Sequence, residues 1–211
     1  MKPIKNSLYI ILCTVAVGLL VYYALIRPLK KQYETRHVAI HGLYMINPVP
    51  IENFELVDQN EKIFTKENLR GHWSLLFFGF THCTMVCPVT FASLNQFYQR
   101  IEKKLSEKDR PQIVFITIDP DRDTSKTLKK YLLQFNRHFI GARTTPEKME
   151  IIKNQFHVIA EKNTPGSDQF NHTTDILLIN PKAEIQAWLY FPQNPLELEL
   201  DYMKILLKQA D

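Results

Sequence analysis

Several features that mark particular classes of protein are absent from this sequence. Its 211 residues contain only three cysteines, and they show no internal repeat and no low-complexity segment. Three cysteines are too few for the disulfide framework of a small secreted domain, and a lone close pair indicates redox or metal chemistry instead. A hydrophobic content of 45% is too high for a disordered chain. The composition therefore predicts a globular protein with its own core.

Basic residues are in excess only near the N-terminus. Six of the 26 Lys and Arg residues and one of the 22 Asp and Glu residues lie in residues 1–36. The remainder of the chain then holds 20 basic and 21 acidic residues, a net charge of −1. No basic stripe is left there to follow a phosphate backbone. The charge pattern excludes nucleic acid as an expected partner.

Charge is absent altogether from residues 8–26 (LYIILCTVAVGLLVYYALI), a run of 19. A helix needs about 20 apolar residues to span a bilayer, so residues 1–27 are predicted to be a membrane anchor. A cleaved signal peptide is the alternative, but its apolar region is usually shorter and no small-x-small cleavage site follows. Basic residues flank both ends, so the charge bias does not settle the orientation. Residues 28–50 are expected to form a polar tether, and residues 51–211 the soluble domain.

The apolar periodicity of the soluble domain predicts an α/β fold. The order is strand, helix, strand, two helices, two adjacent strands and a final helix, after two short strands within residues 51–72. This order predicts a mixed sheet flanked by helices, with its first strands parallel and its last pair antiparallel. The expected strands cover residues 73–80, 112–118, 174–179 and 185–190, and the expected helices cover residues 88–105, 124–135, 146–156 and 196–207.

Cys83 and Cys87 stand where the first long strand gives way to a helix, which is a thioredoxin-like arrangement. Pro88 is tolerated only in the first turn of a helix, so the helix should begin near residues 84–85. Both sulfurs can then face one side, close enough to hold one metal ion or to close a disulfide. Three residues separate the cysteines rather than the two of thioredoxin motifs. The wider spacing lets two thiolates share a soft or borderline ion, chiefly Cu(I) or Zn.

A third ligand is expected from a histidine, and His172 is the strongest candidate. It lies just before the predicted strand at 174–179, on a loop that in thioredoxin-like folds lies against the cysteine turn. That loop usually presents a proline, and none occurs here between Gly166 and Asn180. A structural histidine is the alternative. His82 adjoins Cys83, but adjacent side chains usually point in different directions, so it is expected to position the site rather than to bind metal.

Three aspartates alternate after the predicted strand at 112–118. Asp119, Asp121 and Asp123 resemble the start of a calcium loop, but Thr124 stands at position six and Lys130 at position twelve, so that interpretation fails. Asp123 is placed to cap the following helix. The alternative is that this loop lies beside the cysteines, with Asp119 and Asp123 supporting the ligands from outside.

Taken together, the segments FFGFTHCTMVCP, DPDRDT and NHTT resemble the Sco/SenC family of membrane-anchored copper chaperones. These proteins help to assemble the binuclear copper centre of cytochrome c oxidase, and the resemblance covers about residues 50–208. It implies a thioredoxin-like domain that binds copper, as Cu(I), Cu(II) or both, through Cys83, Cys87 and His172. It also implies a redox-active pair at Cys83 and Cys87, and a single-pass anchor in the cytoplasmic membrane with the domain on the periplasmic side. The implied partner is the copper-bearing subunit of the oxidase or another copper protein.

The spacer between the cysteines departs from the family pattern. Members commonly have Pro-Asp after the first cysteine, whereas this chain has Thr84 and Met85. A carboxylate is lost and a thioether takes its place. Met85 is therefore a candidate for a soft fourth contact to the metal, and the alternative is an apolar side chain packed at the turn.

Two other classes of function fit the cysteine pair. A thiol–disulfide oxidoreductase would reduce cysteines in a partner's copper site, and its activity would survive the loss of His172. A thiol peroxidase or redox sensor would use one cysteine as the reactive group and the other to resolve it. That second class leaves the histidine without a role.

Overall fold

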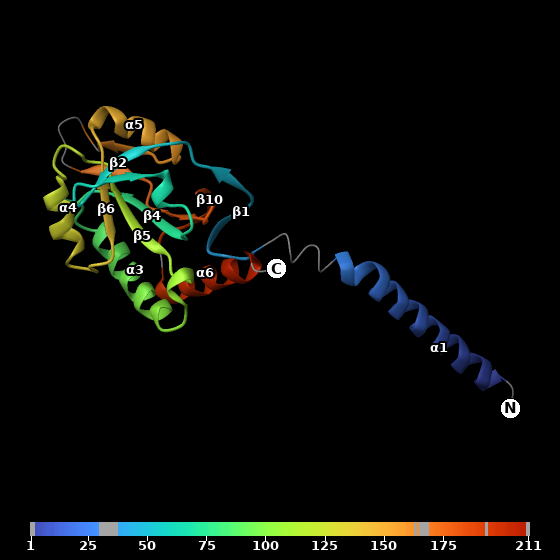
Figure 1. Cartoon of the computed structure of the whole chain (residues 1–211). Helices are drawn as coiled ribbons and strands as arrows, with labels where there is room; N and C mark the ends of the chain where they lie inside the picture. Colours follow the sequence, from blue (N-terminus) through green and yellow to red (C-terminus); the bar gives the residue numbers. More distant parts are fainter. Residues whose placement is uncertain (1–2, 30–37, 163, 165–168, 193, 210–211) are drawn as a thin grey trace. The chain divides into compact units, whose positions relative to one another are not determined.

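The computed structural model describes residues 3–29, 38–162, 164, 169–192 and 194–209 (Figure 1). Contacts between residues divide the chain into two units, an N-terminal one ending at Val38 and a folded one, Ala39–Ala210.

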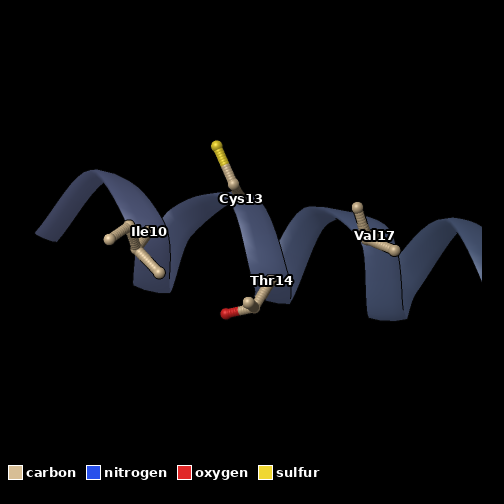
Figure 2. Close-up of a pocket in the computed structure, with 4 residues that line it drawn as sticks. All are labelled: Ile10, Cys13, Thr14 and Val17. Carbon is tan, nitrogen blue, oxygen red and sulfur yellow. The ribbon is translucent and has the colours of Figure 1, made fainter. Parts of the chain in front are cut away.

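The described part of the N-terminal unit, residues 3–29, is helical. It comprises α1 (Pro3–Val21) and a π-helical turn, η1 (Tyr22–Ile26). The segment Ile10–Leu29 is long and apolar enough to cross a membrane, and every side chain along it is exposed. Figure 2 shows Cys13 and Thr14 projecting to opposite sides of this helix. Because the groove bordered by Ile10, Cys13, Thr14 and Val17 comes from one helix only, it is an open helix surface rather than an enclosed site.

The folded unit is built on an eight-stranded mixed sheet, counted within the described residues. Its strand order is β1-β10-β9-β4-β5-β6-β2-β3. β4 pairs in parallel with β5 and β5 with β6, whereas the remaining neighbours are antiparallel. The predicted mixed sheet is confirmed, including its parallel first strands and antiparallel last pair. The strands are β1 (Gly42–Pro50), β2 (Glu55–Asp58), β3 (Ile63–Thr65), β4 (Ser74–Gly79), β5 (Gln112–Thr117), β6 (Ile140–Arg143), β9 (Ile176–Ile179) and β10 (Glu184–Leu189).

Helices cover both faces of the sheet (Figure 1). Every residue of β4 is buried, and its side chains alternate between the faces. Phe77 contacts Phe91 of α3 on one face, where Phe91 also meets Tyr131 of α4. Phe78 contacts Phe156, just after α5, on the other face. The helices are α3 (Val86–Glu102), α4 (Ser125–Leu132), α5 (Pro146–Gln155) and α6 (Pro195–Gln209), with short 3-10 turns η2 (Lys66–Asn68) and η3 (Glu107–Asp109).

The tether predicted for residues 28–50 is too long at its C-terminal end. Residues 42–50 form β1 and pair with β10 at the edge of the sheet, so they belong to the folded unit; residues 30–37 of the tether lie outside the described residues. The N–H of His41 donates to Asp201 at 2.7 Å, and the Gln186 amide donates to the carbonyl of Met45 at 2.7 Å. Pro48 and Pro50 made this segment look unlike a strand in the sequence. An edge strand tolerates prolines, because one of its sides makes no hydrogen bonds to a neighbouring strand.

Two further elements were not predicted from the sequence. β6 is short and contains Gly141, so its apolar pattern is weak. A separate two-stranded antiparallel sheet pairs β7 (Ala160–Lys162) with β8 (Phe170–His172). The chain between these two strands is polar. Residue 163 and residues 165–168 of that segment lie outside the described residues. The second of these elements carries His172.

Candidate metal centre

The cysteine turn connects the end of β4 to the start of α3. The N–H of Cys83 donates to the carbonyl of Phe80 at 3.2 Å, which closes the turn. Helix α3 begins at Val86, one or two residues after the predicted start, and Pro88 falls in its first turn as expected. Cys83 is half-buried and Cys87 is buried, and neither forms a disulfide.

Cys87 is held against the backbone of the strand that precedes it. A Cβ atom added at Gly79 would lie 2.7 Å from Sγ of Cys87 and 3.1 Å from the ring of Phe115. Only a residue without a side chain leaves room there for the sulfur. Gly79 therefore fixes the position of the second cysteine, a role that the sequence did not reveal.

His172 ends β8 and lies against the rings at the end of β4. Its ring centroid is 5.9 Å from that of Phe80 and 6.5 Å from that of Phe77. Nδ1 is 2.8 Å from the carbonyl oxygen of Thr173. Because a carbonyl oxygen only accepts, Nδ1 carries the proton and Nε2 keeps its lone pair. The hydrogen bond thus selects the tautomer that a metal ligand needs.

Cys83, Cys87 and His172 converge. One ligand atom from each lies within 4.8 Å of the others, and no other group of three such side chains does so in the part of the chain that the structure describes. This is close enough for a single ion to contact all three after small side-chain adjustments. Two sulfurs and one imidazole form a soft donor set, which selects Cu(I) or Zn over Mg or Ca.

The two thiols differ in protonation. A hydrogen bond from Cys87 lowers the pKa of Cys83 to about 3, and hydrogen bonds from the N–H groups of Cys87 and Met85 act in the same direction. The N–H of Cys87 lies 3.3 Å from the Cys83 sulfur. The same interaction with Cys83 raises the pKa of Cys87, and burial adds to this. Before metal binds, the pair therefore holds one thiolate, at Cys83, and one proton, at Cys87.

Asp123 ties the cysteine turn to the neighbouring strand. Its buried carboxylate accepts from the N–H of Thr81 at 3.0 Å, from the Thr81 hydroxyl and from the hydroxyl of Thr117 in β5. The expectation that Asp123 caps α4 is wrong, because Thr124 does so by accepting from the N–H of Thr127 at 3.1 Å. The carboxylate oxygens of Asp123 accept from Thr81 and Thr117 instead of from the first N–H groups of α4. The carboxylate thereby orders the residues that lead into Cys83.

His82 and Asp119 lie around this framework rather than in the ligand group. Nδ1 of His82 is 3.2 Å from the Thr81 hydroxyl and 3.8 Å from Asp123, and about half of the side chain is exposed. The buried Asp119 accepts from the Arg122 side chain, and its N–H donates to the hydroxyl of Thr117. His82 contacts the same network that holds the cysteine turn, whereas Asp119 shapes the aspartate loop.

Comparison with known proteins agrees with this geometry. The family model described as SCO1/SenC matches residues 47–205. The chain belongs to the SCO1/SenC family. It is 34% identical over 156 residues to an SCO2-like protein of Rickettsia felis, covering 72% of this chain and 74% of that protein.

Two solved structures with copper bound resemble this Sco-family chain. ScoI of Arabidopsis thaliana is 25% identical with a TM-score of 0.68, and covers 74% of this chain and 98% of its own. ScoI of Bradyrhizobium japonicum is 29% identical with a TM-score of 0.65, and covers 74% of this chain and 99% of its own. The thioredoxin-like fold class is thereby confirmed.

In this family member the cysteine turn faces a cleft of about 220 Å³. Cys83 and His172 both line it, so the ligands can be reached from solvent. Met85 lines it as well and is 74% exposed, so it is not packed at the turn. The other residues along the cleft are Phe80, Thr84, Val86, Gln169, Phe170, Asn171 and Thr174.

Tyr131 is a second residue near the cysteines that the sequence did not single out. Its hydroxyl is buried and makes no hydrogen bond within the described structure, and its ring packs on Phe91 and Phe135. Burial raises the pKa of Tyr131, and the negative charge held by the cysteine pair raises it further. Tyr131 is therefore a neutral phenol beside the buried side of the pair. Nothing in the local sequence distinguishes it from a core aromatic residue.

Proposed function

We propose that this chain is a membrane-anchored copper chaperone that delivers copper to the binuclear copper centre of cytochrome c oxidase. The observation that carries the proposal is the convergence of Cys83, Cys87 and His172 within 4.8 Å, with Cys83 and His172 lining a solvent-accessible cleft. Membership of the SCO1/SenC family and the copper bound to two structural relatives support it.

The donor set suits copper as cargo. Cys83 offers a thiolate, and His172 offers a neutral Nε2 because Nδ1 donates to Thr173. Cys87 holds a proton, which must leave when the metal binds, so loading releases a proton. Two thiolates and an imidazole bind Cu(I) well, and the same ligands also accept Cu(II).

Copper can be released to a client protein because the cleft is open to solvent. A thiolate or imidazole of the client protein approaches through the cleft, and copper passes by ligand exchange to the site that binds it better. The cysteine pair adds a redox gate, because closing a Cys83–Cys87 disulfide removes two ligands. In that step the two metal-bound thiolates give two electrons to a disulfide of the client, which becomes two thiolates, and these take up any protons from solvent. Copper is then left with His172 alone.

The N-terminal helix supports attachment to the cytoplasmic membrane, with the folded unit on the periplasmic side. Ile10–Leu29 has the length and composition of a membrane span. It also offers an apolar surface with no buried side chains, which lipid would cover. In this proposal residues 1–27 are the anchor and the copper-binding domain begins near Ala39.

Anaerobic Cu(I) titration of the reduced full-length chain in detergent tests the proposal. The Cys13→Ser background removes the thiol of the N-terminal helix, and Cys83→Ser and His172→Asn are compared in that background. An asparagine at residue 172 can still donate to Thr173 but offers no Nε2. We expect one copper per chain, with loss of thiolate-to-copper absorption in Cys83→Ser and weaker binding in His172→Asn. A parent chain that binds no copper would refute the proposal.

The unequal cysteines favour a second candidate, a thiol–disulfide oxidoreductase acting on a client's copper site. An accessible thiolate at Cys83 and a buried thiol at Cys87 are what a nucleophile and a resolving cysteine require. Disulfide exchange with a model substrate that is unchanged in His172→Asn, together with no copper binding, would assign the chain to this class. Both activities together would describe a chaperone that also reduces its client.

A further inference from the structure

Met85 occupies an unusual place in the molecule. It precedes the first residue of α3, with φ −125° and ψ −65°, and its side chain is 74% exposed. Among the methionines whose burial is described, Met149 is buried in the core at 3% exposure, and Met45 and Met203 are partly buried. Single exposed apolar side chains are common on protein surfaces, so the significance of Met85 lies in its position at the cleft beside the cysteines.

Met85 lies beside the metal ligands. It is two residues from each cysteine, in the turn that carries both, and its side chain lines the same cleft as Cys83 and His172. The position of the Cα atom is thus fixed relative to the ligand group. The side chain itself is free, and three rotatable bonds let a methionine reach in several directions.

We propose that the thioether of Met85 is a fourth, outermost ligand for Cu(I) at this site. The inference rests on the copper function proposed above and deepens it. A neutral thioether is a soft ligand that favours Cu(I) over Cu(II). The two cysteines and His172 hold the ion from the turn and from β8, and Met85 covers it from the solvent side.

This arrangement gives Met85 a defined effect. It slows the loss of Cu(I) to solvent, and it is the first protein ligand that an incoming client group displaces. Its removal should lower the affinity for Cu(I) more than that for Cu(II). We expect a fall of about tenfold for Cu(I), the lower end of what residues supporting a metal site contribute.

The test uses the full-length chain in detergent, with Met85→Leu and Met203→Leu as a matched pair. Leucine keeps the apolar volume and removes only the sulfur. Met203 lies on α6 and does not line the cleft, so its replacement controls for the loss of a methionine elsewhere. Each chain is prepared with selenomethionine and loaded with Cu(I), and X-ray absorption at the selenium edge reports any copper bound to selenium.

A copper–selenium contact in the parent and in Met203→Leu, lost in Met85→Leu, is the expected result. Competition titration should show weaker Cu(I) binding in Met85→Leu alone. If the parent binds copper but shows no such contact, and Met85→Leu binds Cu(I) as tightly as the parent, the inference is overturned and the chaperone proposal stands. If the parent binds no copper, both are overturned.

Discussion

A Cβ atom at Gly79 would lie 2.7 Å from Sγ of Cys87. The sulfur of Cys87 therefore packs directly against the backbone of Gly79, the last residue of β4. The φ angle of Gly79 is not in the left-handed region, since Gly71 is the glycine with positive φ among the described residues. Glycine is needed at residue 79 for space rather than for backbone freedom, and that space determines where one ligand of the site lies.

Gly79→Ala should weaken metal binding and destabilise the domain. The added methyl group forces the buried Cys87 sulfur or the ring of Phe115 to move, and overpacking of this kind costs about 1–3 kcal/mol. Urea unfolding of the metal-free chain measures the free energy of unfolding, and Cu(I) competition measures the affinity.

Gly141→Ala is the matched control for that variant. A Cβ atom there would lie 2.6 Å from Cδ1 of Leu132, between β6 and α4. It should destabilise the domain to a similar extent but leave metal affinity unchanged. Equal loss of copper affinity in both variants would contradict a specific role for Gly79.

Asp123→Asn should disorder the cysteine turn. The carboxylate accepts hydrogen bonds from Thr81 and Thr117, and an amide group has only one accepting oxygen, so at least one buried donor loses its partner. The free energy of unfolding should fall by about 1–3 kcal/mol, and Cu(I) affinity should fall with it. Asp121→Asn is the control, because Asp121 is exposed; an equal effect there would show that charge alone is responsible.

Alkylation of the two cysteines should depend on pH in different ways. Because the pKa of Cys83 is lowered to about 3, it stays a thiolate as the pH falls from neutrality and loses reactivity only near that value. An ordinary thiol, with a pKa of about 8.5, loses about tenfold in rate per pH unit below it. Iodoacetamide labelling of the metal-free reduced chain, read by peptide mass spectrometry, should give a flat rate for Cys83 between about pH 5 and about pH 8.

Cys87 should remain almost unlabelled throughout that range, because burial blocks access and its pKa is raised. The unfolded chain in urea is the control, in which both cysteines should show the ordinary dependence. A tenfold loss of Cys83 labelling per pH unit in the folded chain would refute the thiolate assignment.

Truncation should reveal where the folded unit begins. A chain starting at Ala39 keeps β1 and should fold, whereas one starting at Ile51 exposes the edge of β10. The shorter chain also loses the hydrogen bonds that join His41 to Asp201, Met45 to Gln186 and Ala39 to Lys204. We expect it to be less stable by about 2 kcal/mol or more and to aggregate through the open edge. Equal urea midpoints would contradict this.

Local patterns predicted most of the framework of the sheet. The apolar run before the cysteines is the fully buried β4, and the apolar spacing after them is α3, because a hydrophobic period is a property of neighbouring residues. The strand at β1 was missed since its prolines conceal an edge strand. The capping role expected for Asp123 was wrong, because its carboxylate accepts from donors that lie in the cysteine turn and in β5, outside its own segment.

The sequence alone determined the cysteine pair at a strand-to-helix turn, the apolar N-terminal helix and the resemblance to the family. Only the tertiary structure placed His172 within 4.8 Å of both sulfurs, because the hairpin of β7 and β8 carries it there. The same holds for the space at Gly79, the thiolate at Cys83 and the exposure of Met85. Each depends on which distant segments pack together, and that is decided by strand pairing and burial over the whole domain rather than by any local run of residues.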